Sequence, residues 1–202
     1  MTLQADLNRM RYIITGGPGS GKSSLIEALR NKGVHCYSEV SRELIRQQIM
    51  ISDGVMPWNN LPAFARLAFN GMLRQHDQSL STSNLVFFDR GLPDIFGYLH
   101  HGGFAIPLDF LEAHAGCRYN TEVFILPPWP DIYIKDSERP QSYEESEALF
   151  HSIHNTYNSL GYTLHEVPKA SVAERINYLF SITGTIFNPS HRSTPIRHPE
   201  LL

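Results

Sequence analysis

The 202-residue chain has little cysteine, no excess of basic residues and no long apolar run. Its two cysteines, Cys36 and Cys117, form no CxxC pair and no disulfide framework, which indicates a reducing compartment. A net charge of −3 disfavours bulk binding to nucleic acid or to an anionic membrane. The first residues lack the apolar core of a signal peptide, and no apolar run approaches the roughly 18 residues that would span a bilayer. We therefore expect a cytoplasmic protein that binds neither membranes nor nucleic acid.

The size and composition fit one globular domain, because 42% of the residues are hydrophobic and 18% are charged. The apolar pattern predicts strands at 12–15, 33–39, 84–89, 122–126 and 162–167. It predicts helices at 23–32, from about 41, from 62 to about 81, and at 91–102, 107–116, 142–160 and 172–180. Several strands are apolar throughout, which indicates an α/β fold with a parallel sheet that helices cover on both faces. We expect this domain to span residues 1–183, and residues 184–202 to form a peripheral or disordered tail.

Residues 16–23, GGPGSGKS, match the pattern G-x-x-x-x-G-K-[ST] at every fixed position. A predicted strand precedes them and a predicted helix follows, which is the context that this phosphate-binding loop requires. Glycines let the backbone turn its N–H groups inward, and the start of a helix attracts anions. The expected phosphate ligands are Gly17, Pro18, Gly19, Ser20, Gly21, Lys22, Ser23 and Ser24. The motif therefore predicts a nucleoside triphosphate site, in which Lys22 provides a catalytic cation.

Two oxygen-bearing side chains are candidates for binding Mg²⁺ beside this loop. The Ser23 hydroxyl follows the lysine directly, and Asp89 ends the apolar strand LVFFD. An acid at the carboxyl end of the strand beside the first one faces the phosphate loop in such folds. The alternative for Asp89 is a surface residue that begins a turn. We expect Ser23 and Asp89 to hold Mg²⁺ and ATP to be the nucleotide, because no Asn-Lys-x-Asp guanine motif is present.

Beyond the phosphate loop, the motifs SEVSREL, FFDRG, PPWPD…ERPQSYEES and HEVP follow one another in the chain. In this order, they resemble the P-loop kinase-like family of small predicted ATPases, which carry an AAA-domain label without being AAA+ motors. That family is similar to nucleoside and nucleotide kinases, including ribosylnicotinamide kinases. The resemblance runs from Tyr12 to about Phe180. It implies a three-layer P-loop NTPase fold with a mainly parallel five-stranded sheet in the order 2-3-1-4-5.

The resemblance also implies roles for charged residues near the phosphates. The Asp89-Arg90 pair is similar to the kinase motif in which the arginine contacts the substrate, whereas motor ATPases carry Asp-Glu. In small-molecule kinases an acid after the second strand receives the substrate hydroxyl, which implies a catalytic and substrate-binding role for Glu39, with Arg42 beside it. The alternatives are a structural ion pair for Arg90 and a solvated helix surface for Glu39 and Arg42.

The family places a lid and a base-binding segment at two further positions. The proline-bounded segment at about 128–142 is the expected lid, and its Arg139 could bind two oxygens of the transferring phosphoryl group. A plain solvated loop is the alternative there. In kinases of this type the segment after the last strand holds the nucleotide base, so Pro168 is the expected contact.

These observations predict a Mg²⁺-dependent kinase that transfers the ATP γ-phosphoryl group to a small hydroxylated acceptor, nucleoside- or nucleotide-like. The alternative is an ATPase that acts as a nucleotide-dependent regulatory switch or partner-binding module, because the phosphate loop alone fits both. Neither the acceptor nor a protein partner can be named from the sequence.

Overall fold

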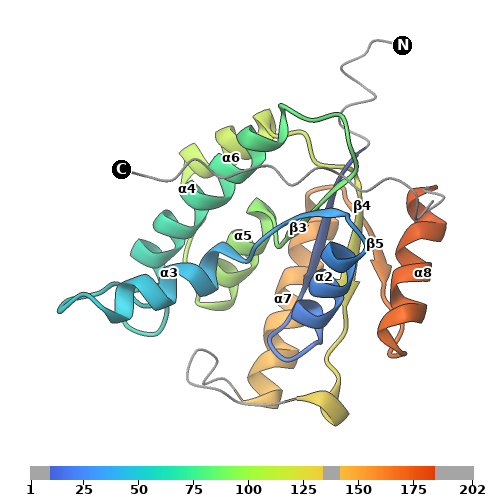
Figure 1. The fold of residues 1–202 in the computed structure, drawn as a ribbon. Helices are drawn as coiled ribbons and strands as arrows, with labels where there is room; N and C mark the ends of the chain where they lie inside the picture. Colours follow the sequence, from blue (N-terminus) through green and yellow to red (C-terminus); the bar gives the residue numbers. More distant parts are fainter. Residues whose placement is uncertain (1–9, 134–141, 185–202) are drawn as a thin grey trace.

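A five-stranded parallel sheet forms the centre of the protein in the computed structural model, which describes residues 10–133 and 142–184. The strands are β1 (Arg11–Gly16), β2 (His35–Tyr37), β3 (Val86–Asp89), β4 (Glu122–Leu126) and β5 (Thr163–Glu166). They lie in the order β2-β3-β1-β4-β5, and every neighbouring pair is parallel (Figure 1). The predicted fold class and strand order are therefore confirmed.

The helices correspond closely to the predicted ones. They are α2 (Lys22–Asn31), α3 (Val40–Ile49), α4 (Leu61–Ser79), α5 (Leu92–His101), α6 (Leu108–Gly116), α7 (Tyr143–Ser159) and α8 (Val172–Thr183), with a 3-10 turn, η1, at Pro130–Ile132. Side-chain caps fix several starts: Asn60 accepts a bond from the Ala63 N–H before α4, and Ser142 and Ser171 form capping boxes before α7 and α8. None of the helices in the described ranges has the length and apolar character needed to cross a membrane.

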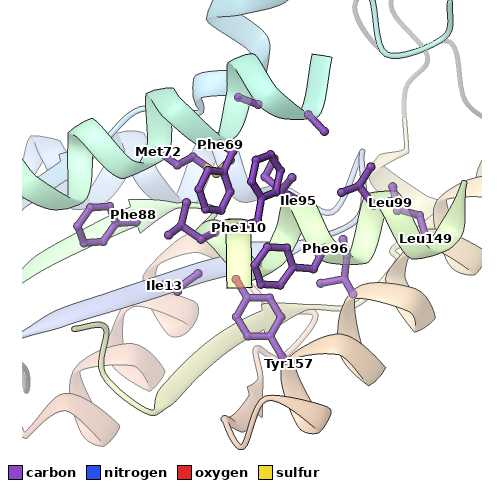
Figure 2. Close-up of a cluster of buried hydrophobic side chains, with 14 of the residues drawn as sticks. Ile13, Phe69, Met72, Phe88, Ile95, Phe96, Leu99, Phe110, Leu149 and Tyr157 are labelled. Carbon is purple, nitrogen blue, oxygen red and sulfur yellow. The ribbon is translucent and has the colours of Figure 1, made fainter. Parts of the chain in front are cut away.

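The alternation of side chains along the strands divides the core into two layers. Ile13 and Phe88 point toward the face covered by α4, α5 and α7, and they join the cluster in Figure 2 that includes Phe96 of α5. Ile14 and Phe87 point to the opposite face, where α2 and α8 pack. The three central strands are thus apolar on both sides, as their unbroken apolar sequences predict.

Helices α5 and α7 approach each other closely at Gly97. A Cβ atom at this position would lie 3.0 Å from the Cα of Ile153, in the backbone of α7. The Ser152 hydroxyl of α7 also donates a hydrogen bond to the Gly97 carbonyl oxygen, at 2.8 Å. The spacing of these two helices therefore depends on a residue without a side chain.

We expect Gly97→Val to lower the free energy of unfolding by about 2 kcal/mol relative to Gly116→Val, because the added side chain must push α7 away. Gly116 lies at the end of α6, and a Cβ atom there would meet nothing within 4 Å. Both changes place valine in a helix, so the comparison separates the steric effect from helix propensity. Chemical denaturation measures the difference, and equal stability of the two variants would contradict the close approach.

Candidate functional site

The phosphate loop connects β1 to α2, and its backbone has the conformation that the glycines permit. Gly16, Gly19 and Gly21 have φ angles of +136°, +70° and +81°, a region that residues with side chains rarely adopt. The loop is also tightly enclosed, because a Cβ atom on Gly17 would lie 2.9 Å from the carbonyl oxygen of Ser146 in α7. The Ser146 hydroxyl donates a hydrogen bond to the Pro18 carbonyl oxygen at 2.8 Å. The sheet and α7 therefore hold the loop in a fixed curve.

Lys22 lies inside this curve, with only 3% of its surface exposed. Its Nζ donates to the carbonyl oxygens of Gly16 and Gly17, each at 3.0 Å. No side chain of the described residues caps the start of α2 at Gly21. The first-turn N–H groups of α2 and the lysine ammonium are therefore the donors that an anion in the loop would meet.

Asp89, at the carboxyl end of β3, is 6% exposed. Within the described residues its Oδ1 is buried without a hydrogen-bond partner. Burial, together with the nearby Glu39 carboxylate, raises the pKa of Asp89 to about 6, while Lys22 and Arg90 oppose the shift. Asp89 and Ser23 line the same cavity. Buried carboxylate oxygens normally have a hydrogen-bond partner, and a bound cation would take that place at Asp89 Oδ1.

The residues around Asp89 fit Mg²⁺. A buried carboxylate oxygen that lacks a donor, beside the Ser23 hydroxyl, offers the hard oxygen ligands that this ion prefers. No group of three or more His, Cys, Asp or Glu side chains suited to a metal occurs among the described residues. Mg²⁺ at phosphoryl-transfer sites needs only one or two protein ligands, because phosphates and water complete its shell.

Arg90 connects the phosphate loop to the acid that follows β2. It is buried, and it is the one residue other than glycine with a positive φ, +73°, in the described part of the chain. Its Nε donates to Glu39 Oε1 at 3.0 Å, and its Nη1 donates to the Gly16 carbonyl oxygen at 3.0 Å. The ion pair considered from the sequence is therefore present, and it joins two segments of the predicted site.

Sequence reasoning did not identify Asp94, which holds Arg90 from the other side. This fully buried carboxylate accepts from Arg90 Nη1 at 3.2 Å, from the Gly91 N–H at 2.9 Å and from the Tyr157 hydroxyl at 2.6 Å. The Thr15 hydroxyl of β1 also donates to it. The spacing of four residues between Arg90 and Asp94 at the start of α5 was the available sequence signal.

The structure brings Glu39, Arg42 and Arg90 together in one pocket of about 380 Å³. Pro18 of the phosphate loop forms part of the same wall. Most of the remaining lining is apolar or aromatic, and it includes Ile45, Pro57, Trp58, Leu61, Phe64, Ala65, Ile95, Tyr98 and Leu149. The three residues predicted to contact a substrate therefore share a pocket directly beside the phosphate loop.

Two aromatic residues that line this pocket were not predicted from the sequence. Trp58 lies in the loop between α3 and α4 and is 52% exposed, and Tyr98 of α5 lies under the Arg90 guanidinium, 5.4 Å from its carbon. Neither carries a local signal, because Trp58 belongs to a turn-rich segment and Tyr98 to an ordinary amphipathic helix. Only the folding of α3, α4 and α5 around one space places them together.

Two further residues were predicted to belong to the site, Pro168 and Arg139. Pro168 is exposed in the connection from β5 to α8, and it lines neither the pocket nor the cavity that contains Ser23. On this side of the loop Arg175 of α8 lies over the Trp129 ring, 5.6 Å from the ring centre, and its Nη1 donates to the Gly21 carbonyl oxygen at 3.4 Å. Arg139 lies outside the described residues, as do positions 134–141 of the predicted lid and 185–202 of the tail.

Solved structures share this fold at low sequence identity. Deoxyadenosine kinase from M. mycoides, with products dCMP and dCDP bound, is 15% identical and has a TM-score of 0.61, over 88% of this chain and 100% of that one. Thymidylate kinase from Ehrlichia chaffeensis is 14% identical with a TM-score of 0.58, over 86% and 98% of the two chains. NadR in complex with NR is 18% identical with a TM-score of 0.67, over 92% of this chain and 55% of NadR.

No curated protein matches the chain significantly. A family model described as an AAA domain matches residues 11–175, which include the phosphate loop, the Asp89-Arg90 pair and Arg175. The match covers most of the sequence. The chain therefore belongs to this AAA domain family, and its P-loop NTPase fold is that of the nucleoside and nucleotide kinases.

Proposed function

We propose that the protein is a Mg²⁺-dependent kinase that transfers the γ-phosphoryl group of ATP to a small hydroxylated acceptor. One observation carries the proposal: Arg90 joins the phosphate loop, through the Gly16 carbonyl oxygen, to Glu39 in the adjoining pocket. An enzyme that only hydrolyses ATP needs no pocket for an organic acceptor beside its phosphate loop. The position of this pocket therefore favours an acceptor other than water.

The residues divide the transfer between them. Lys22 and the N–H groups at the start of α2 bind the phosphates and stabilise the charge of the transferring group. Glu39 takes the proton as the acceptor oxygen forms its bond to the γ-phosphorus, and the bond from that phosphorus to the bridging oxygen breaks to release ADP. Such a carboxylate is effective because phosphoryl transfer requires mainly alignment and a proton acceptor.

Arg90 orients Glu39 for this role, since its Nε holds one carboxylate oxygen at 3.0 Å. Its Nη2 makes no hydrogen bond within the described residues, while Nε and Nη1 are both engaged. We assign Nη2, together with Arg42, to the acceptor or its transferring group. Ser23 and Asp89 would hold Mg²⁺, which neutralises phosphate charge when bound.

The walls of the pocket favour a flat, ring-containing acceptor. Trp58, Phe64 and Tyr98 provide aromatic surface, and Arg90 holds Glu39 and the Gly16 carbonyl oxygen of the phosphate loop. A nucleoside-like molecule combines such a ring with hydroxyl groups. The structural neighbours named above, two of them nucleoside or nucleotide kinases by name, support this class of acceptor.

A second function, a nucleotide-dependent module that binds a protein partner, has one feature in its favour. Ile49, Met50 and Ile51, at the end of α3, are exposed at 54%, 85% and 54%. Helix α3 begins at the pocket, so a partner on its far end could sense the nucleotide. ATP-dependent partner binding that Lys22→Ala removes, without any acceptor being phosphorylated, would support this function over the kinase.

A screen of nucleosides, nucleotides and other small hydroxylated metabolites should identify an acceptor that receives ³²P from γ-labelled ATP. We expect transfer to one chemical class, because the pocket combines aromatic walls with the charged side chains of Glu39, Arg42 and Arg90. Consumption of ATP to water alone, whichever acceptor is added, would overturn the kinase proposal.

We expect Lys22→Ala to lower turnover at least about 100-fold, because the ammonium is the cation nearest the phosphates. Circular dichroism should show an unchanged fold. Lys32→Ala, which removes a lysine from the exposed end of the same helix, serves as the control and should retain activity. Activity of Lys22→Ala equal to that of Lys32→Ala would contradict the assignment of the loop.

Glu39→Gln should lower kcat about 100-fold and leave the affinity for ATP nearly unchanged, because it removes a proton acceptor and not a phosphate contact. Glu43→Gln changes a carboxylate one turn further along α3 that accepts a bond from Gln47. This control should keep its kcat. Single-turnover kinetics would separate the chemical step from binding, and an equal loss in both variants would refute Glu39 as the base.

A further inference from the structure

Arg175, in the first turn of α8, is a buried cation that the mechanism above does not use. It is 5% exposed, and its Nε is buried without a hydrogen-bond partner in the part of the chain that the structure describes. Its Nη1 makes one long hydrogen bond, 3.4 Å, to the Gly21 carbonyl oxygen. Burial lowers the pKa of this guanidinium, and no neighbouring carboxylate opposes the shift. Arginine nevertheless stays protonated in proteins, so Arg175 carries a charge that is poorly compensated.

The acids on the two elements around Arg175 have other partners. Glu174 precedes it and accepts hydrogen bonds from the N–H group and the hydroxyl of Ser171, at 3.0 and 2.6 Å. Asp131 of η1 accepts a bond from the Trp129 indole at 3.3 Å. Among the described residues, no acid forms an ion pair with Arg175. The position of a counter-charge is therefore left to a ligand.

The Trp129 ring orients the guanidinium of Arg175. The central carbon of the guanidinium lies 5.6 Å from the centre of this ring. An aromatic face attracts a cation, but it carries no full negative charge and no oxygen that could accept from the guanidinium. The contact therefore holds the side chain in place while its N–H groups keep their capacity to bind an anion.

The first turn of α8 has a fixed position beside α2 (Figure 1). Ser171 caps the helix, and its carbonyl oxygen accepts a bond from the Arg175 N–H at 3.0 Å. The next residue, Ile176, is buried together with Leu179 against Leu25 of α2. Arg175 therefore occupies its place as part of the packed core, with no need for a rearrangement.

Arg175 reaches the end of α2 at which the phosphate loop closes. A Cβ atom on Gly21 would lie 2.8 Å from Arg175 Nη1, so glycine leaves the room that the guanidinium needs. Gly21 is the N-cap of α2, and the N–H groups that follow it attract anions. Lys22 serves the same helix end from inside the loop, and Arg175 lies on the side of α8.

We propose that Arg175 is a further nucleotide-binding residue, which pairs with the phosphate chain of the bound nucleotide. The inference rests on the nucleotide binding proposed above for the phosphate loop, and it requires no acceptor. A phosphate chain supplies the negative charge and the oxygen acceptors that Arg175 lacks, and the planar guanidinium fork can bind two such oxygens. An uncharged base would supply no counter-charge.

Isothermal titration calorimetry of the full chain with ADP and Mg²⁺ tests the pairing. We expect Arg175→Met to weaken ADP binding at least about tenfold, because it removes a charge-assisted contact. The affinity of this variant should also depend less on salt than that of the unmodified chain, since one ion pair is lost. A weaker affinity with unchanged salt dependence would indicate contact with the uncharged base and would overturn the pairing.

The stability of the nucleotide-free protein separates this role from a structural one. Arg175→Met should melt no lower than the unmodified chain, because replacing a poorly compensated buried charge by an apolar side chain removes its desolvation cost. A lower melting temperature with unchanged ADP affinity would overturn the proposal. Arg175→Lys keeps a cation and should bind ADP more tightly than Arg175→Met, and equal affinities of these two variants would contradict an ionic role.

Arg66→Met is the matched control. Arg66 also lies over an aromatic ring, 4.2 Å from the centre of Phe110, but it is exposed and pairs with Asp109. This variant should keep the ADP affinity of the unmodified chain. Failure of the unmodified chain to bind ADP would overturn the phosphate loop and this inference together. ADP binding that depends on Arg175, without transfer to any acceptor, would support the inference and overturn the kinase alone.

Discussion

The rest of the site depends on the hydrogen bonds and ion pairs that the buried guanidinium of Arg90 makes. A charge with 3% exposure is costly unless each of its partners is in place, and removal of one partner leaves the other unpaired. Here the partners come from three separate segments: Glu39 after β2, Gly16 in the phosphate loop and Asp94 in α5. The positive φ of Arg90 turns its side chain across the ends of the strands toward these groups. One residue therefore fixes the relative positions of the loop and the acid.

The sheet explains why these segments meet. In a parallel sheet all carboxyl ends lie on one edge. Here β1 and β4 end opposite each other at Gly16 and Leu126, and β3 ends two residues earlier in register, where Asp89 pairs with Ile14. The loops after β1, β2 and β3 then face a common space. Helix α3 divides that space into an apolar pocket beside Pro18 and an arginine-lined cavity beside Ser23. The start of α3 therefore borders two spaces, one with a mostly apolar lining and one lined by arginines.

Local patterns predicted the strands, the helices and the phosphate loop, because each depends on residues adjacent in the chain. The apolar runs around Ile13 and Phe88 suffice to place buried strands, and the resemblance to kinases supplied their order. The grouping of Glu39 with Arg90 followed from the same resemblance. Asp94, Trp58 and Arg175 could not be predicted, since their neighbours come from segments far away in the sequence. The second strand and the ends of α4 and α8 differ from expectation by two or three residues, as helix and strand ends commonly do.

Helix α7 touches both halves of the site. Near its start, Ser146 donates to the Pro18 carbonyl oxygen, and near its end the Tyr157 hydroxyl donates to Asp94. Between them Leu149 lines the apolar pocket beside Pro18, and Gly97 sets the distance from α7 to α5. A rigid helix cannot shift at one of these points and stay fixed at the others. For the kinase proposed above, we therefore expect α7 to couple the binding of the phosphoryl donor to the binding of the acceptor.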